Sequence, residues 1–173
     1  MKLVFAVDAI FPPLTGIGRY AYELADRLTQ VDELESLRFL SMWRWAPMKV
    51  GQAHRSAALI APRLVAAPRR WLANQYWAIA PYDFASERWR AHLLKGARDA
   101  VYHSPNYFLA PHEGPSLATV HDLSVSRYPQ THPAARRRYF ELAFERSLRR
   151  ASMLITVSET VRQEVIADYG VAP

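Results

Sequence analysis

The sequence predicts a doubly wound α/β domain in which helices cover both faces of a parallel sheet. Short, continuous apolar runs recur along the chain, as is typical of strands that are buried on both faces. Segments of helical periodicity alternate with these runs, which indicates strand–helix–strand units. The 173 residues, half of them apolar, are enough to bury one core. The absence of cysteine excludes disulfide scaffolds, zinc ribbons and thiol nucleophiles.

Five apolar runs are expected to form the strands. The first and last are the strongest, Leu3–Val7 and Met153–Val157, and neither contains a charged residue. Three weaker runs of the same kind lie between them, at Leu37–Met42, Ala100–Tyr102 and Leu117–Val120. Because such runs lack polar alternation, we expect both faces of the sheet to be covered.

Three segments show the three- and four-residue spacing of an amphipathic helix. The first contains Ile17, Tyr20, Ala21, Leu24, Leu28 and Val31 on one face. The second runs from about residue 133 to residue 150. The third contains Val161, Val165 and Tyr169, begins after Ser158 or Thr160 as N-cap, and ends at Gly170.

Residues 43–98 fit this alternation poorly and are expected to form a basic, helical insert. The chain carries a net charge of +6, and this segment alone carries +8, against −2 for residues 1–42 and zero for 99–173. All five tryptophans lie in the same segment. It contains helix-compatible pieces near 53–60, 70–80 and 87–98 but no clear strand.

Polar residues follow four of the five predicted strands. They are Asp8, His103 with Ser104, His121 with Asp122, and Ser158. The carboxyl ends of parallel strands meet at one edge of a sheet, where ligands bind in open α/β folds. Each residue also has a plain structural interpretation, as a loop cap, a buried hydrogen-bonding histidine or a helix N-cap. Their convergence on one edge predicts a ligand site there.

Two glycines open the first predicted helix and suit the binding of an anion. Gly16 and Gly18 leave backbone N–H groups unobstructed at a helix N-terminus, where phosphate oxygens are stabilised. The string Gly16-x-Gly18-x-x-Ala21 also matches a relaxed dinucleotide fingerprint. However, the first glycine comes late after the strand, and the second strand ends at Met42-Trp43 without an acidic residue to hold a ribose. An NAD(P)-binding oxidoreductase domain is therefore a disfavoured alternative.

Several other chemistries lack their motifs. The sequence has no Gly-x-Ser-x-Gly elbow, no Gly-x-x-x-x-Gly-Lys-Ser/Thr loop and no His-Glu-x-x-His helix. His103, His112 and His121 are spaced by nine residues but fall in different predicted elements, so a shared metal ion is not expected. There is no Asp-x-Asp pair to hold a divalent ion on a nucleotide sugar. We expect neither a metal ion nor a cofactor.

Several motifs stand out at both ends of the chain. They are Thr15-Gly16-Ile17-Gly18-Arg19-Tyr20, Val101-Tyr102-His103-Ser104-Pro105-Asn106-Tyr107, Ala118-Thr119-Val120-His121-Asp122-Leu123, Pro129, and Met153-Leu154-Ile155-Thr156-Val157-Ser158-Glu159. Together they resemble the amino-terminal half of a family 4 retaining glycosyltransferase, and are similar to mannosyltransferase-like group 1 enzymes. The resemblance covers 1–30 and 99–173 and is nearly absent from 43–98.

This resemblance implies one half of a GT-B fold, in which two Rossmann-like domains face each other across a cleft. Residues 1–173 would be the amino-terminal, acceptor-side domain. The carboxy-terminal domain, which holds most of the nucleotide-sugar donor and carries the family's Glu-x7-Glu motif, has no counterpart in these residues. We therefore expect a hexosyltransferase whose isolated amino-terminal domain is inactive.

The resemblance also suggests roles for individual residues. Gly16 and Gly18 match the loop that approaches the donor diphosphate, although many relatives have adjacent glycines there. His121 matches the histidine that reaches the donor sugar, where it would position and stabilise while the leaving diphosphate deprotonates the acceptor. The candidates for acceptor binding are Asp8, His103, Asn106 and Ser158.

The basic insert is where the functional hypotheses diverge. In the glycosyltransferase interpretation, Trp43, Arg44, Trp45, Arg69, Arg70 and Trp71 contact the anionic inner membrane surface or a lipid-diphosphate-linked acceptor. The plain alternative is a solvated arginine face with tryptophans that pack helices. A nucleic-acid-binding α/β module is the alternative in another functional class, but no dense basic run or RNA or DNA motif supports it.

No targeting signal or membrane span is recognisable in the sequence. We therefore expect a cytoplasmic protein, peripheral on the inner face of the cytoplasmic membrane, that acts in surface polysaccharide synthesis. Its expected partners are its own carboxy-terminal domain, a nucleotide sugar and a glycan or lipid-linked acceptor, and not nucleic acid.

Overall fold

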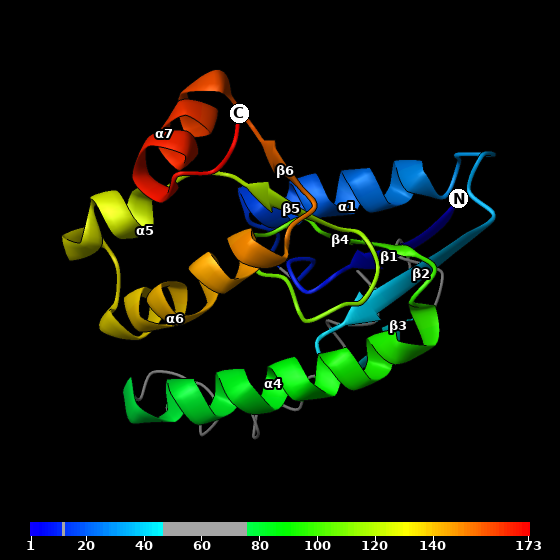
Figure 1. Ribbon diagram of the computed structural model, residues 1–173, viewed down its shortest axis with the longest axis horizontal. Coiled ribbons are helices and arrows are strands. Elements are labelled where there is room, and N and C mark those ends of the chain that lie inside the picture. The colour runs from blue at the N-terminus through cyan, green and yellow to red at the C-terminus, as the bar shows by residue number, and fades with distance from the viewer. Residues whose placement is uncertain (12, 47–75) are drawn as a thin grey trace.

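The protein is built around one six-stranded sheet (Figure 1). The computed structural model describes residues 1–11, 13–46 and 76–173. The strand order is β3-β2-β1-β4-β5-β6, and all neighbouring strands are parallel except β2 and β3. The strands are β1 (Lys2–Ala6), β2 (Ser36–Ser41), β3 (Arg44–Ala46), β4 (Val101–Ser104), β5 (Ser116–Val120) and β6 (Met153–Thr156). The order reverses direction between β1 and β4, which is where open α/β sheets form a ligand crevice.

Helices cover both faces of this sheet, as the sequence predicts. The helices are α1 (Gly16–Leu28), α4 (Ile79–Leu94), α5 (Ser124–Arg127), α6 (Ala134–Arg150) and α7 (Glu159–Tyr169), with short 3-10 turns η1 (Tyr76–Ala78), η2 (Lys95–Ala97) and η3 (Pro129–Thr131). In Figure 1, α1 lies on one side of the strands and α4 with α6 on the other. Alternate residues of β1 divide accordingly: Phe5 packs with Ala25 of α1, whereas Val4 packs with Leu94 of α4. The Rossmann-like, doubly wound fold is confirmed.

The predicted helix ends are set by local hydrogen bonds. Thr15 Oγ1 accepts from the Gly18 amide at 3.1 Å and caps α1, and Ser158 caps α7 by accepting from the Val161 amide at 3.2 Å. Gly170 ends α7 in the left-handed conformation, with φ of 63°. Of the two predicted N-caps for α7, the structure selects Ser158. The first helix ends at Leu28, so the prediction that Val31 belongs to its apolar face is wrong.

The prediction that the insert contains no strand is also wrong. β3 pairs antiparallel with β2 through Ser41↔Arg44 and Leu40↔Trp45, joined by a two-residue turn. A strand of three residues is too short to show a period in the sequence. Trp45 is half-buried, and its ring lies 3.5 Å from the Arg38 guanidinium, whereas Trp43 in the turn is 40% exposed.

The second correction concerns the helices of the insert. The sequence suggests a helix-compatible piece near 87–98, but α4 begins earlier, at Ile79, ends at Leu94, and contains Pro81; residues 70–75 of the piece predicted near 70–80 lie outside the described residues. Pro81 lies in the first turn of the helix, where a backbone N–H has no intrahelical acceptor and its loss is tolerated. The predicted piece 53–60 and the residues Arg69, Arg70 and Trp71 lie outside the described residues.

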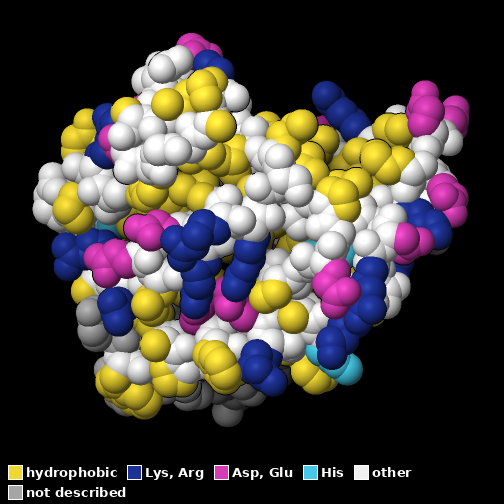
Figure 2. Space-filling model, viewed as in Figure 1, with side chains coloured by type: hydrophobic (Ala, Val, Ile, Leu, Met, Phe, Trp, Pro, Cys, Tyr) yellow, Lys and Arg dark blue, Asp and Glu magenta, His cyan; other side chains and the backbone are white. Residues whose placement is uncertain are grey.

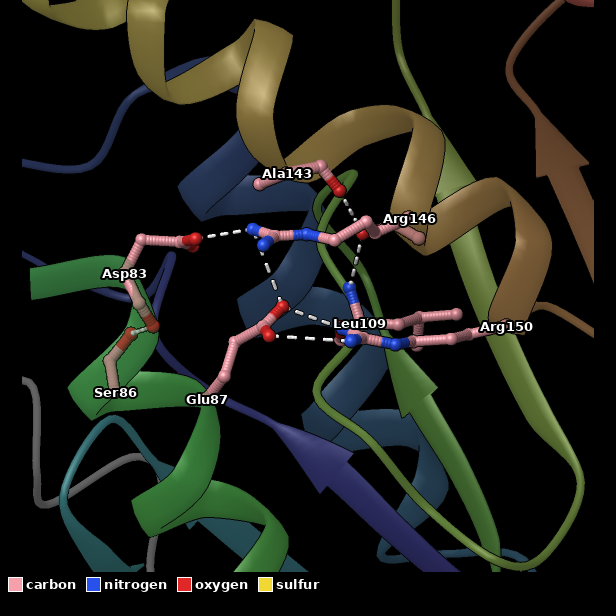
Figure 3. Close-up of polar contacts among 8 residues, drawn as sticks. Asp83, Ser86, Glu87, Leu109, Ala143, Arg146 and Arg150 are labelled. Carbon is pink, nitrogen blue, oxygen red and sulfur yellow. Dashed lines mark hydrogen bonds and ion pairs between the residues drawn. The ribbon is translucent and has the colours of Figure 1, made fainter. Parts of the chain in front are cut away.

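A network of ion pairs joins α4 to α6. Figure 2 shows acidic and basic side chains gathered between these two helices, and Figure 3 shows their contacts. Asp83, whose side chain is 4% exposed, pairs with Arg146. Glu87 lies 3.5 Å from Arg146 and accepts from Arg150 at 2.6 Å. Arg150 also donates to the Leu109 carbonyl at 3.0 Å, so the network fixes α4, α6 and the β4–β5 connection relative to one another.

Candidate functional site

A large cavity opens at the carboxyl ends of β1, β2 and β4. Its volume is about 750 Å³, and it lies between this edge of the sheet, the start of α4 and the start of α6. Its walls are mainly apolar, and a few polar side chains point into it from different elements. The lining residues are Ala6, Asp8, Ala9, Met42, Ala78, Ile79, Tyr82, Arg90, Ser104, Pro105, Asn106, Phe108, Pro133, Ala135, Arg136 and Tyr139. A mainly apolar cavity with few convergent polar groups is typical of a small-molecule site.

Asp8 and Arg90 form an ion pair in this cavity. Asp8 follows β1, Arg90 lies on α4, and their side chains are 21% and 13% exposed. Burial raises the pKa of the Asp8 carboxyl, and the attraction of the Arg90 guanidinium opposes this effect. Asp8 Oδ1 and Arg90 Nε are both buried without a hydrogen-bond partner. The pair therefore contributes one free acceptor and one free donor with little net charge.

Asn106 supplies a third unpartnered polar atom. It follows β4, and its Oδ1 is buried with no hydrogen bond, while its carbonyl accepts from Ser104 Oγ at 3.3 Å. The next residue, Tyr107, has a positive φ of 45°, which is unusual for a bulky side chain. The Tyr107 amide donates to the Thr119 carbonyl at 2.9 Å, and the Asp122 amide donates to its hydroxyl at 3.2 Å. These bonds hold the strained turn that places Asn106 at the cavity.

The chemistry of the cavity suits a hydroxylated ligand. A buried polar atom without a partner costs about 1–3 kcal/mol, so side-chain rotations that turn these three buried atoms towards ligand hydroxyls would recover that free energy. The rings of Tyr82, Phe108 and Tyr139 also line the cavity and offer flat surfaces to the apolar face of a sugar. The site can bind and orient a polyol at the carboxyl edge of the sheet.

A smaller cavity of about 220 Å³ adjoins the first, between the start of α1 and the start of α6. Thr15 and Ile17 line it, and Asn106 and Arg136 line both cavities. Among the described residues, Arg136 has no carboxylate within ion-pair distance, whereas Arg146 and the other arginines near the end of α6 are paired. An unpaired guanidinium beside the N-terminus of α1 suits the binding of a phosphate.

The two glycines of the anion loop differ in their surroundings. A Cβ on Gly18 would lie 2.7 Å from the Ala9 carbonyl oxygen, so packing requires a glycine there. A Cβ on Gly16 would meet no atom within 4 Å, and the φ of Gly16 is not positive. Gly16 is thus the glycine that neither packing nor backbone conformation explains, and the space that its Cβ would occupy at the start of α1 is open.

His121 is held in one orientation against Tyr107, which lines the smaller cavity, although His121 itself lines neither cavity. Its Nε2 donates to the Pro105 carbonyl at 2.8 Å, and its ring packs edge-on against Tyr20 and Tyr107, with centroids 5.1 and 5.8 Å away. Because a carbonyl oxygen only accepts, Nε2 carries a proton, and Nδ1 is the ring nitrogen left to contact a ligand. A half-buried imidazole in this orientation can orient a ligand hydroxyl.

His103 and Ser158 line neither of the two cavities described above. His103 lies inside β4 rather than after it, is 6% exposed, faces α1, and has its Nε2 3.1 Å from Thr119 Oγ1. Burial lowers the pKa of His103 to about 4. Ser158 caps α7. The structure thus gives both residues a structural role, and acceptor binding by either stays a prediction.

Three residues that line the larger cavity are not predicted by any sequence pattern above: Arg90, Arg136 and Tyr139. Arg90 belongs to the basic insert, where no motif marks it. Its signal is a periodicity: Ile79, Asp83, Ser86 and Arg90 recur at three and four residues and are the inward face of α4. Arg136 and Tyr139 lie in the first two turns of α6 and have no distinguishing pattern in one sequence.

Neither a cluster of metal ligands nor a membrane-spanning helix is found in the part of the chain that the structure describes. Across residues 1–11, 13–46 and 76–173, no group of three or more histidine, aspartate or glutamate side chains is placed to hold a metal ion. None of the helices in these ranges has the length and apolar character needed to cross a bilayer.

Comparison with known proteins places this site in a family. A family model described as Glycosyltransferase Family 4 matches residues 14–173. The O-antigen chain mannosyltransferase B of Escherichia coli is 36% identical over 168 residues, which are 96% of this chain and 43% of that protein. The chain thus spans less than half the length of this relative. No solved structure matches the chain significantly. With the doubly wound fold and the motifs at its sheet edge, these matches show that the chain belongs to glycosyltransferase family 4.

Proposed function

We propose that this chain is the acceptor-binding part of a retaining hexosyltransferase that moves mannose from a nucleotide sugar onto a glycan or lipid-linked acceptor in surface polysaccharide synthesis. Family membership and the name of the Escherichia coli relative support sugar transfer and the choice of mannose. The observation that carries the acceptor assignment is the larger cavity, because it contains three buried polar atoms without partners, on Asp8, Arg90 and Asn106.

The two cavities suggest separate binding sites for the acceptor and the donor. An acceptor sugar in the larger cavity would bind Asp8 Oδ1, Arg90 Nε and Asn106 with its hydroxyls. The Gly16 amide, between two residues that line the smaller cavity, and the Arg136 guanidinium, which lines it, would bind the donor diphosphate. In retaining transfer the bond from the anomeric carbon to the diphosphate breaks, the acceptor oxygen bonds to the same face, and the departing diphosphate takes the hydroxyl proton. His121 Nδ1 would orient the donor sugar during this step.

Transfer would need groups in addition to these 173 residues. The relative is more than twice as long as the region that it shares with this chain. Stabilisation of the departing diphosphate is a large contribution to such a reaction, and Arg136 alone supplies little of it. We propose that a donor-binding domain completes the site, that no metal ion takes part, and that the protein works at the cytoplasmic face of the membrane. Membership in family 4 removes the support for the nucleic-acid and nicotinamide alternatives.

The Asn106→Ala variant tests this function. Because Asn106 Oδ1 has no partner in the protein, its removal should leave the unfolding midpoint unchanged or slightly raised. In the full-length protein, the same change should raise the KM for a lipid-linked oligosaccharide about fivefold to thirtyfold, as the loss of 1–2 kcal/mol of hydrogen bonding predicts. Transfer of radiolabelled mannose from its nucleotide is the measurement. Unchanged acceptor KM, or absence of transfer by the wild type with any nucleotide sugar, would contradict the proposal.

A further inference from the structure

One face of α4 points away from the sheet and is exposed. Its residues recur at three and four positions and form what we term the α4 outer face: Trp77, Ala80, Pro81, Phe84, Arg88, His92 and Lys95. Trp77 is 66% exposed and Phe84 is 63% exposed. The apolar residues occupy the first half of this face and the cations the second half, and the Arg88 guanidinium lies 5.5 Å from the Phe84 ring centroid. Figure 2 shows hydrophobic and basic side chains along the lower edge of the molecule, where α4 runs in Figure 1.

The charged side chains of this face are basic because the acidic residues of the helix form ion pairs on its opposite face. The two acidic residues of α4 are Asp83 and Glu87, and both turn inward to Arg146 and Arg150 of α6 (Figure 3). The outer face is left with the cations Arg88 and Lys95 and with no acidic side chain of α4 to neutralise them. Its charge is therefore complementary to an anionic partner.

Aromatic side chains extend the apolar part of the face towards the β2–β3 turn. Trp89 is 45% exposed, and its Nε1 donates to the Trp43 carbonyl at 2.8 Å. The ring of Tyr82 lies 6.1 Å from that of Trp43, and both rings are about 40% exposed. These contacts hold the exposed rings in place, so that several aromatic surfaces are presented together on one side of the molecule.

We infer that the α4 outer face, with Trp43, Tyr82 and Trp89, docks on an anionic lipid bilayer. Tryptophan and tyrosine favour the interface between water and lipid, and arginine and lysine are attracted to anionic headgroups.

Docking by this face has a consequence for the larger cavity. Ala78, Ile79 and Tyr82, from the start of the same helix, line that cavity. The docked molecule would therefore hold the cavity beside the membrane surface, where a lipid-linked sugar is presented. This consequence rests on the proposed function, whereas docking itself does not.

Vesicle binding tests the inference. The purified protein is sedimented with vesicles of phosphatidylglycerol and phosphatidylcholine, with vesicles of phosphatidylcholine alone, and, separately, titrated with a single-stranded oligonucleotide. We expect binding to the anionic vesicles that weakens as salt is raised, and far weaker binding to neutral vesicles. Arg88→Gln should reduce the affinity about fivefold. Trp77→Ser with Phe84→Ser should reduce it at least tenfold, because two apolar side chains leave the interface.

Matched controls separate this surface from general charge and hydrophobicity. Arg27→Gln makes the same change of charge on the exposed surface of α1, and Tyr128→Ser removes an aromatic ring that is 58% exposed after α5. Both should bind vesicles like the wild type. Equal losses in the controls, no vesicle binding, or tighter binding to the oligonucleotide than to anionic vesicles would overturn the inference. Transfer to a water-soluble oligosaccharide by the full-length protein, measured in parallel, reports on the proposed function alone, since it needs no membrane.

Discussion

Alanine at Gly16 and at Gly18 should have opposite effects on stability. At Gly18 the new Cβ would lie 2.7 Å from the Ala9 carbonyl oxygen and 3.3 Å from Leu14 Cδ2. The first neighbour is backbone, so the β1–α1 connection must move by several tenths of an ångström. Such overpacking costs about 1–3 kcal/mol, and the better helix propensity of alanine returns up to about 1 kcal/mol. We expect a net loss of about 1–2 kcal/mol.

At Gly16 the new Cβ meets no atom, and the backbone conformation is accessible to alanine. The substitution should therefore stabilise the protein by about 0.4–1 kcal/mol, because it restricts the unfolded chain. For a domain of this size, 1 kcal/mol corresponds to about 2–4 °C in Tm. Gly18→Ala should lower the midpoint of thermal unfolding by about 2–8 °C, and Gly16→Ala should raise it by about 1–4 °C.

Thermal unfolding followed by circular dichroism is sufficient to measure both shifts. The comparison also separates a structural glycine from a functional one. If Gly16 lacks a side chain because a ligand approaches it, Gly16→Ala should weaken donor binding in the more stable protein. Equal destabilisation by the two substitutions would refute the reasoning from packing.

Three further predictions concern stability. Arg146→Met leaves the Asp83 carboxylate, which is 4% exposed, without its partner, and should lower the free energy of unfolding in urea by about 3–5 kcal/mol. Arg149→Met removes an exposed pair and should lower it by less than about 1 kcal/mol, so similar losses in the two variants would contradict the role of the buried network. The pKa of His103 is about 4 in the folded protein and 6.5 in the unfolded chain, so the stability that this residue contributes is complete above pH 6.5 and is lost as the pH falls towards 4. Between pH 7 and pH 5 the wild type should lose about 2 kcal/mol that His103→Gln does not lose, and parallel pH profiles of the two proteins would show that His103 is not the group responsible. Gly170→Ala places a Cβ on a residue with φ of 63° and should cost about 1 kcal/mol in thermal unfolding, with an unchanged midpoint as the contrary result.

The parts of the fold that could be predicted are those with a local cause. The apolar runs of β1, β2, β5 and β6 are recognisable because strands of a sheet covered by helices are mainly apolar, although only β1 and β5 are largely buried and β6 has Met153 exposed. The N-cap at Ser158 and the stop at Gly170 are recognisable because hydrogen bonding and a positive φ restrict the residue type. β3 lacks such a cause. Its three residues are too few to show a periodicity, and the strand is held by its pairing with β2.

The candidate site shows the same division. Asp8 and Asn106 follow predicted strands, and the edge where parallel strands end is a general site for ligands, so both could be nominated from the sequence. Arg90, the partner of Asp8, could not, because this pairing depends on the path of α4 across the sheet. His103 was nominated by position, but a residue within a strand faces one side of the sheet, and the pleat of β4 turns this ring to α1.

Steady-state kinetics with both substrates varied most directly tests the central claim, that acceptor and donor bind to different parts of this sheet edge. In the full-length protein, Asn106→Ala should raise the KM for the acceptor oligosaccharide and leave the KM for the nucleotide sugar within about twofold of wild type. Gly16→Ala should do the reverse, with a donor KM raised about fivefold or more if one hydrogen bond to a phosphate is lost. An unchanged acceptor KM in Asn106→Ala, or an effect of Gly16→Ala on the acceptor alone, would contradict the account.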